Sequence, residues 1–412
     1  MTSPTVRTIR EDELAAFIAV PLVAMHHMSP ASDEAIEVRR EIWELDRCLA
    51  AFDATGTLCG SARSFATQLS LPGGEVAAAA VSSVGVLPTH RRQGHFNRMM
   101  DAQLTDVAAR GEPVAILVAA EYPIYGRYGY GPAAEACAVR LDTANGEFRE
   151  PATGSVSLVD NKAFHDALVE VYDRAWARSH GHITWAPPFA EIRAGLRDTY
   201  DGGDEERRNA RKLIWRDGDG SVQGVAAYTV RDDWVDNRPS GELLTLMLEA
   251  ATDEAERELF RFLASVDWVA TVRAGLRPVD DPLPLRLVDG RQAVLLDRSD
   301  HIWTRLLDVP AALTARRYAT PDRIVFEVVD PLGFAAGRFA LDAGPDGAAC
   351  TRTDETADLA VPVGALGAAY LGGMPWLRLA AAGWVSEQRP GATARASAMF
   401  ATARSPWCST SF

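Results

Sequence analysis

The sequence lacks three features that would point to other classes of protein. No stretch approaches the ~20 consecutive apolar residues that span a bilayer, so a membrane protein is excluded. The five cysteines lie far apart, are odd in number and form no CxxC pair, so we expect reduced packing residues and no metal site. The first ten residues have no apolar run of the kind found in secretory signals, and we therefore expect a cytoplasmic location.

Excess positive charge is also missing. The formal net charge is -14, which repels phosphate backbones and attracts cations. We therefore expect a cationic small-molecule partner and no nucleic acid. The length of 412 residues is several times that of a typical domain of ~100 to 150 residues, which predicts two or three packed units.

The apolar pattern of the first third predicts the order strand, two helices, three strands, helix, strand, short helix, strand. Alternating or continuous apolar runs give the strands, and runs of helical spacing give the helices. The strands are expected over 6–10, 48–52, 58–70, 77–86, 113–120 and 130–141, and the longer helices over 12–26, 32–45 and 96–110.

A second unit is expected to open after the loop 145–154, and its middle repeats the order of the first. A hairpin over 212–230 is followed by a strand over 243–248, a helix over 253–265 and a strand over 268–276. From about residue 306, strands and apolar helices alternate as a third unit. The predicted fold class is α+β, with domains over 1–145, 146–300 and 301–412.

The clearest chemical signal is the junction between the strand that ends at Val86 and the following helix. Here Arg91, Arg92 and Gly94 form a basic, glycine-containing turn at a helix N-terminus. Such a turn directs backbone N–H groups outward and the helix dipole adds positive charge, so it binds a diphosphate. Gly94 lets the backbone approach the phosphates closely. The competing interpretation is a solvated connection between two elements.

A second signal is a cluster of tyrosine and glycine residues that follows the next strand, over 121–131. Tyr125 lies four residues before Gly129. A phenol, with an unperturbed pKa of ~10, stays protonated at neutral pH and can donate its proton to a nearby sulfur. The alternative is that the tyrosines only pack, and for Tyr122, Tyr128 and Tyr130 packing is the favoured interpretation.

These two blocks resemble the GNAT acetyltransferase superfamily. Its acetyl-CoA signature Q/R-x-x-G-x-G/A is matched by Arg91 and Gly94, with Phe96 in place of the small residue. The resemblance implies that Tyr125 protonates the departing thiolate of coenzyme A. It also implies an acetyl-CoA site formed by Val84, Gly85, Val86, Arg91, Arg92, Gln93, Gly94, His95, Phe96 and Glu121.

In the form THRRQG and IYGRYGYGPA, the blocks are similar to the Eis (enhanced intracellular survival) family of GNAT enzymes, and the similarity extends over the whole chain. It implies an N-terminal GNAT fold, a central GNAT-like fold and a C-terminal fold like sterol carrier protein. It further implies a homohexamer, and catalysis in which the carboxylate of Phe412 deprotonates the acceptor amine without any metal. From the residues alone, Phe412 is equally a buried apolar plug.

The central copy differs from the first at its strand-to-helix junction. Residues Glu249, Asp253 and Glu254 place carboxylates around the helix start, where the first copy has a basic turn. Carboxylates there would repel a phosphate. The sequence therefore predicts a degenerate copy that binds no cofactor.

The acceptor side departs from the family pattern. Ala120, Glu121, Tyr122 and Pro123 stand where many members have serine, glutamate and two glycines, so we expect a narrower and stiffer wall. The predicted acceptor residues are Trp43, Glu41, Asp46, Ser83 and Tyr122. The predicted function is transfer of acetyl from acetyl-CoA to a primary amine of a cationic, aminoglycoside-type molecule. The alternatives are a dedicated metabolite amine, a protein lysine, or a non-catalytic protein that binds an apolar ligand or partner.

Overall fold

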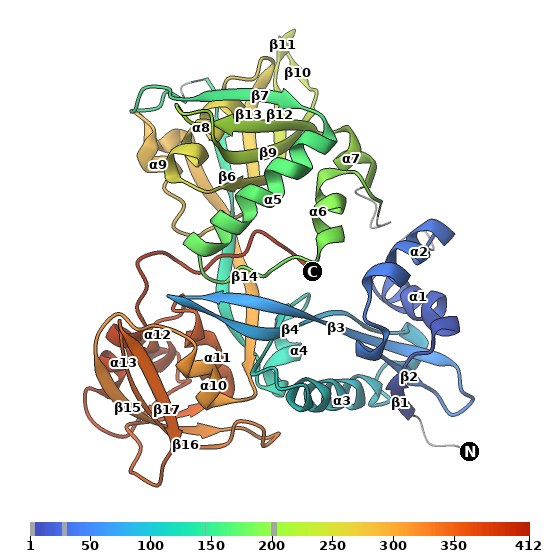
Figure 1. The fold of residues 1–412 in the computed structure, drawn as a ribbon, viewed down its shortest axis with the longest axis vertical. Coiled ribbons are helices and arrows are strands. Elements are labelled where there is room, and N and C mark those ends of the chain that lie inside the picture. Colours follow the sequence, from blue (N-terminus) through green and yellow to red (C-terminus); the bar gives the residue numbers. More distant parts are fainter. Residues whose placement is uncertain (1–4, 27–30, 145, 199–203) are drawn as a thin grey trace. The chain divides into compact units, whose positions relative to one another are not determined.

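The computed structural model describes residues 5–26, 31–144, 146–198 and 204–412, which fold into two compact units (Figure 1). The first unit combines Met1–Ala134 with Asp300–Ala403 and Ser411–Phe412, and the second combines Glu135–Ser299 with Arg404–Thr410. The division into domains over 1–145, 146–300 and 301–412 stays a prediction. Within the described ranges, no helix combines the length and the apolar character needed to cross a membrane.

The first unit is built on a sheet whose strand order is β1-β2-β3-β4-β5-β14. Strands β1 to β4 pair antiparallel with their neighbours, β4 and β5 run parallel, and the end of β14 pairs antiparallel with β5. The bounds are β1 Thr5–Thr8, β2 Cys48–Phe52, β3 Leu58–Leu71, β4 Gly74–Val86, β5 Val114–Val118 and β14 Ala293–Leu306. The strands predicted for this part of the chain all form, with end points shifted by a few residues.

Helices cover both faces of this sheet (Figure 1). A Cβ atom added at Gly85 would meet Ala24 at 3.1 Å, whereas one at Gly60 would meet Met99 at 2.9 Å, so these glycines let α1 and α3 approach the backbone closely. The bounds are α1 Leu14–Ala24, α2 Asp33–Ile42 and α3 His95–Ala109. All three were predicted, and the first ends at Ala24, two residues before the end of the predicted range 12–26.

The second unit repeats the arrangement, with strand order β6-β13-β12-β9-β8-β7. Successive side chains of β8 and β9 point to opposite faces of the sheet and so contribute to two different cores. Trp215 and Ala226 pack with α8, whereas Ile214 and Val225 pack with α5. The strands are β6 Gly131–Asp142, β7 Ser155–Val159, β8 Arg211–Arg216, β9 Val222–Arg231, β12 Gly241–Ala250 and β13 Val269–Arg277. A two-stranded ribbon joins β10 Trp234–Val235 to β11 Arg238–Pro239.

The helices of the second unit are α5 Asn161–Arg178, α6 Pro187–Ala194, α7 Asp204–Asn209, α8 Asp253–Ala264 and α9 Leu283–Arg286. The predicted hairpin, strand, helix and strand are β8, β9, β12, α8 and β13. Helix α5 was not predicted, although Phe164, Leu168, Val171 and Ala175 are buried at helical spacing along it.

The C-terminal part of the first unit has its own sheet, of order β17-β16-β15-β18-β19. Its strands are β15 Asp322–Val329, β16 Gly337–Gly344, β17 Gly347–Arg352, β18 Leu359–Pro362 and β19 Ser386–Glu387, and its helices are α10 Val309–Thr314, α11 Val363–Tyr370, α12 Trp376–Ala381 and α13 Ala392–Phe400. Strands and helices alternate here, as predicted from about residue 306. The mixed α+β fold class is confirmed.

All five cysteines are free and buried. Burial raises the pKa of each thiol, to about 12 for Cys48, Cys350 and Cys408 and to about 11 for Cys137. The thiol of Cys59 shifts in the same direction. The cysteines are therefore protonated packing residues at neutral pH, as expected from their spacing.

Candidate functional site

A bulge in β4 interrupts its regular pairing with β3 in the sheet of the first unit. Ser61 pairs with Gly85 and Arg63 with Ser82, so two residues of β4 stand opposite the single residue Ala62. Ser83 accommodates this with a positive φ of 54°, and its carbonyl accepts a 2.8 Å hydrogen bond from the Ser61 hydroxyl. The parallel pairing of β4 with β5 runs from Ala78↔Val114 to Val81↔Leu117. Beyond it the end of β4 and the residues that follow β5 line a pocket.

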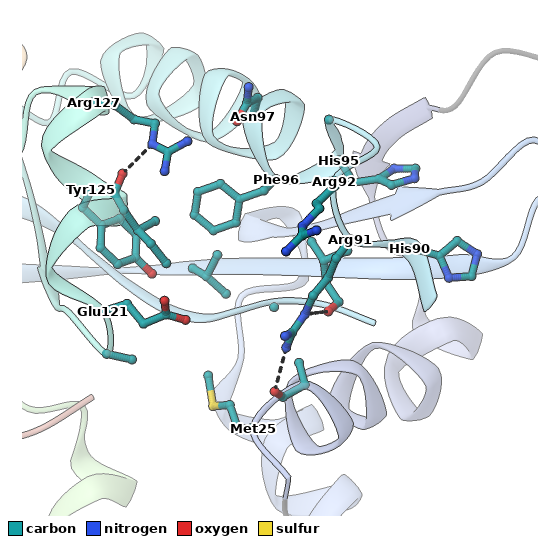
Figure 2. Close-up of a pocket in the computed structure, with 17 residues that line it drawn as sticks. Met25, His90, Arg91, Arg92, His95, Phe96, Asn97, Glu121, Tyr125 and Arg127 are labelled. Carbon is teal, nitrogen blue, oxygen red and sulfur yellow. Dashed lines mark hydrogen bonds between the residues drawn. The ribbon is translucent and has the colours of Figure 1, made fainter. Parts of the chain in front are cut away.

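This pocket has a volume of about 560 Å³ (Figure 2). The end of β4 and the following turn form one side, and the residues after β5 form the other. Its lining residues are Ala24, Met25, Val84, Gly85, Val86, His90, Arg91, Arg92, Gly94, His95, Phe96, Asn97, Ala120, Glu121, Ile124, Tyr125 and Arg127. The pocket therefore brings together the two motifs that the sequence singled out.

The basic turn has the backbone form that an anion site needs. Arg92 and Gly94 have positive φ angles of 63° and 78°, and Gly94 caps the N-terminus of α3. Successive amide groups in such a turn point to one side and meet the positive end of the helix dipole. A Cβ atom at Gly94 would lie 3.2 Å from Arg98 in addition to the strain of its φ angle. The turn therefore fits a diphosphate.

Two arginines of the turn extend toward the pocket (Figure 2). The Arg91 guanidinium donates to the carbonyl oxygens of Ala24, at 3.2 Å, and Val86, at 3.5 Å. These bonds hold the end of α1 against the turn. Arg127, on the opposite wall, donates to the Ile124 carbonyl at 3.1 Å. The pocket lining therefore carries three guanidinium groups, two on the turn and one on the opposite wall.

The histidines of the turn have supporting positions. His90 lies 3.3 Å from the Asp53 carboxylate, and His95 is buried with both ring nitrogens 3.8 Å from the Cys59 sulfur. Burial, and then the nearby Arg98, lower the pKa of His95, which keeps its ring neutral at pH 7. His95 therefore packs the start of α3 and adds no positive charge to the turn.

Tyr125 ends α4, Tyr122–Tyr125, and its ring lies in the opposite wall. The ring centroid is 6.1 Å from that of Phe96 and 6.0 Å from that of Tyr130. Burial, and then the charge of Glu121, raise the pKa of the Tyr125 phenol to about 12. Tyr125 therefore remains a proton donor over the whole physiological pH range.

The neighbouring tyrosines stabilise this wall. The Tyr128 hydroxyl donates a 2.6 Å hydrogen bond to Asn97 on α3, and its ring lies 5.7 Å from that of Phe96. Tyr130 is buried, and burial raises its pKa well above the ordinary value. Tyr122 is 53% exposed and its ring lies 4.9 Å from that of Trp303.

The structure places the remaining predicted residues outside this pocket. Gln93 turns its amide back to the Thr89 carbonyl at 3.4 Å, and Asp46 lies 3.0 Å from Arg110. Trp43 packs edge-on against Phe17. Glu41 is exposed near the end of α2, Ser83 forms the bulge, and the Phe412 ring lies 5.6 Å from that of Phe65 on β3. The cofactor role of Gln93, the base role of Phe412 and the acceptor-side roles of the other residues stay predictions.

Several pocket residues were not predicted from the sequence. His90 and Asn97 lie within the basic turn and the first turn of α3, so their positions followed from the motif. Ala24 and Met25 come from the end of α1, and nothing in their sequence shows that this helix reaches the pocket. Arg127 lies within the tyrosine-rich segment, whose pattern of aromatic and glycine residues gives no signal for an arginine in the pocket wall.

The corresponding junction of the second unit is closed by its own side chains. Thr252 caps α8 by accepting a hydrogen bond from the Ala255 amide, and Asp253 forms ion pairs with Arg178 and Arg404. The first turn of α8 carries Asp253, Glu254 and Glu256. Because these carboxylates occupy the positive end of the helix, the junction does not fit a phosphate group.

Three domain families match the chain. An Acetyltransferase (GNAT) domain family matches residues 5–133, a second Acetyltransferase (GNAT) domain family matches residues 193–299, and a Sterol carrier protein domain family matches residues 309–409. The predicted order of two GNAT folds followed by a sterol-carrier-like fold is therefore confirmed.

Curated relatives extend over most of the chain. An uncharacterized N-acetyltransferase of Streptomyces griseus is 39% identical over 98% of both chains. N-acetyltransferase Eis of Mycobacterium tuberculosis is 35% identical over 76% of both chains. The crystal structure of Eis1 from Mycobacterium abscessus is 34% identical, with a TM-score of 0.86 over 99% of this chain and 100% of that one. A GCN5-related N-acetyltransferase from Anabaena variabilis shares the fold, with a TM-score of 0.83 and 19% identity over 99% of this chain and 100% of that one.

Proposed function

The chain belongs to the Eis family of GNAT N-acetyltransferases, and from this premise we propose that it transfers acetyl from acetyl-CoA directly to a primary amine of a cationic, aminoglycoside-type molecule. The observation that carries the proposal is the pocket of about 560 Å³, which joins the anion-binding turn at one end to Tyr125 in the opposite wall. A donor that has a diphosphate and a reactive thioester needs both features.

The turn and the end of β4 would hold the donor. Amides of the Arg92–Gly94 turn and the N-terminus of α3 would bind the diphosphate, and Arg91 and Arg92 would neutralise it. The pantetheine would follow the backbone of Val84 to Val86, which lies beyond the last pair between β4 and β5. Backbone donors of this segment would also polarise the thioester carbonyl.

Tyr125 would protonate the sulfur as it leaves. Its pKa of about 12 keeps the phenol protonated before the reaction. Transfer to a thiolate of ordinary pKa, ~8.5, is unfavourable in water, and the same apolar wall that raises the pKa of Tyr125 raises that of a buried thiolate as well. The proton donor and the leaving group are thereby brought closer in basicity.

The C-terminal carboxylate of Phe412 is the proposed base for the acceptor amine. An unperturbed α-carboxylate, with a pKa of ~3.5, is too weak a base for an ammonium group. The role therefore requires either burial that raises the carboxylate pKa or a water molecule that relays the proton. The contact between the Phe412 and Phe65 rings supplies an apolar neighbour to one side.

The acceptor is tested with a panel of amines. We expect acetyl-CoA-dependent addition of acetyl groups to aminoglycosides, detected by mass spectrometry of the products, because the net charge of -14 favours polycationic acceptors. An aminoglycoside with its amines already acetylated is the matched control. Acetylation of a small metabolite amine or of protein lysine, without any aminoglycoside product, would overturn the choice of acceptor and leave the donor chemistry standing.

One observation favours the alternative acceptor, a dedicated metabolite amine. Pro123 stands in the first turn of α4, and the Tyr122 ring packs at 4.9 Å on Trp303. Both make the wall after β5 stiffer than the two glycines common in the family would, which suits one dedicated amine better than many.

A non-catalytic role for the chain has no comparable support. Family resemblance also supports assembly as a homohexamer.

A further inference from the structure

The last part of the chain packs as an integral piece of the second unit. Residues Arg404–Thr410 belong to this unit, whereas Ser411–Phe412 belong to the first. Arg404 forms a 2.8 Å ion pair with Asp253, and the Ser405 amide donates to Asp280 at 2.8 Å. The Thr410 hydroxyl accepts a 3.1 Å hydrogen bond from Trp185. We call residues 404–410 the tail segment.

Trp407 is the residue of the tail segment with the most specific surroundings. Its indole N–H donates to the Leu276 carbonyl at 2.5 Å, and its amide donates to the His180 carbonyl at 2.9 Å. The Arg277 guanidinium lies 5.1 Å from the ring centroid, and the His182 ring meets it edge-on at 4.8 Å. These contacts fix both the backbone and the ring of Trp407.

Gly181 makes room for this backbone. It has a φ of 100°, and an added Cβ atom would lie 3.1 Å from both the amide nitrogen and the carbonyl oxygen of Trp407. A side chain at position 181 would therefore displace the tail segment.

The tail segment enters the cleft that corresponds to the donor pocket of the first unit. Strands β12 and β13 are parallel and joined by α8, as β4 and β5 are joined by α3. Their pairing runs to Thr245↔Ala274. Beyond it a cavity of about 150 Å³ is lined by residues 245–249 of β12, residues 275–277 of β13, Arg193, Trp407 and Ser409.

We propose that the degenerate GNAT fold has become a binding site for the chain's own tail, and that Trp407 is a positioning residue that sets the reach of Phe412. The inference rests on the proposed function, in which the Phe412 carboxylate acts as the base. Phe412 is the fifth residue after Trp407, and five residue steps span at most about 18 Å. Fixing Trp407 thus confines the carboxylate to a small volume and lowers the entropic cost of placing it for reaction.

The substitution Trp407→Ala tests the proposal by two readouts. We expect the tail to become accessible to carboxypeptidase, with release of C-terminal residues followed by mass spectrometry at least tenfold faster than in the native chain. We expect kcat to fall by at least tenfold, with acetyl-CoA affinity measured by calorimetry unchanged. Trp407→Phe should recover part of both effects, because it keeps an aromatic ring but loses the indole N–H that donates to the Leu276 carbonyl. Trp234→Ala, at a half-exposed tryptophan of the same unit, is the matched control.

The outcomes separate this inference from the proposed base. Equal trimming of the native and Trp407→Ala chains would overturn the inference. Suppose that deletion of Phe412 abolishes activity. If Trp407→Ala then releases the tail but leaves kcat unchanged, the inference is also overturned. A released tail with activity that survives deletion of Phe412 would leave the tail site standing and remove the base. Should Trp407→Ala fail to fold, Trp407→Phe combined with Arg404→Ala decides in the same two assays.

Glu249 makes the packing around the tail depend on pH. It is only 1% exposed and lines the cavity together with Ser409. Burial raises the pKa of Glu249 to about 7; nearby Ser409, Arg193 and Arg277 oppose this shift and Glu256 adds to it. Tyr172 and Cys408, which also face Glu249, are protonated at neutral pH because burial raises the pKa of each.

The sign of the effect follows from the raised pKa. The folded chain holds a proton on Glu249 between pH ~4.3, where the unfolded side chain titrates, and about 7. The proton bound to Glu249 stabilises the folded chain. This contribution to the free energy of unfolding is complete below the unfolded pKa and is lost as pH rises to about 7. We therefore expect the thermal midpoint of the native chain to fall relative to that of Glu249→Gln between pH 4.5 and 8.5. Glu150→Gln, at an exposed carboxylate of the same unit, should follow the native chain at both pH values. An equal difference between native and Glu249→Gln chains at both pH values would contradict this.

Discussion

Replacement of Tyr125 by phenylalanine is expected to lower kcat by about 100- to 1000-fold, the usual contribution of a positioned general acid. The hydroxyl is the only group removed, so the ring keeps its contacts with Phe96 and Tyr130. The diphosphate turn lies on the opposite wall and is untouched. Acetyl-CoA affinity should therefore stay within about twofold, while the rate of thiol release collapses.

Single-turnover rates and calorimetric binding of acetyl-CoA would separate the two effects. Tyr228→Phe, at a buried tyrosine of the second unit, controls for the loss of a buried hydroxyl. Because the pKa of Tyr125 is about 12, the native rate should show no alkaline loss from this group up to pH ~9. An unchanged kcat in Tyr125→Phe would remove the tyrosine from the mechanism.

Replacement of Gly131 by alanine is expected to destabilise the first unit by about 3 kcal/mol. An added Cβ atom at Gly131 would lie 1.8 Å from the Gly364 carbonyl oxygen and 2.7 Å from the Ala368 amide nitrogen. Both are backbone atoms of α11, so no side chain can rotate away. Helix α11 would have to shift away from the start of β6 to accept a single methyl group.

Urea unfolding with a linear extrapolation would measure the loss. Gly126→Ala is the matched control, because that position has a helical φ of -57° and no heavy atom within 4 Å of an added Cβ. It should be neutral or slightly stabilising. Equal stability of the two variants would show that α11 can move freely at this point.

The strand, turn and helix around Gly94 could be predicted because local chemistry fixes them. A positive φ at the start of a helix needs glycine, and basic residues beside it mark an anion site. The repeat in the second unit was also readable from sequence, since the order of hairpin, strand, helix and strand survives there without the basic turn. Tyr125 was found by its spacing from Gly129, which holds the αL conformation after the turn.

Features that depend on long-range packing could not be predicted. The approach of α1 to the pocket is set by the missing side chain of Gly85, and no sequence pattern pairs Gly85 with Ala24. The tail segment carries Trp407 into the second unit over more than a hundred residues of separation from Leu276. Trp43 has the residue type of an acceptor wall, yet its ring packs on Phe17 and beneath the Arg63 guanidinium at 4.6 Å.

The burial of every cysteine has a practical consequence at the bench. Reagents that colour free thiols react with exposed thiolates, and this chain presents neither exposure nor thiolate at neutral pH. In a mixture of enzyme, acetyl-CoA and amine, the folded protein therefore contributes almost no background signal from its own thiols. The absorbance then measures the coenzyme A that is released, one molecule for each amide formed. Turnover can therefore be followed continuously in a plate reader.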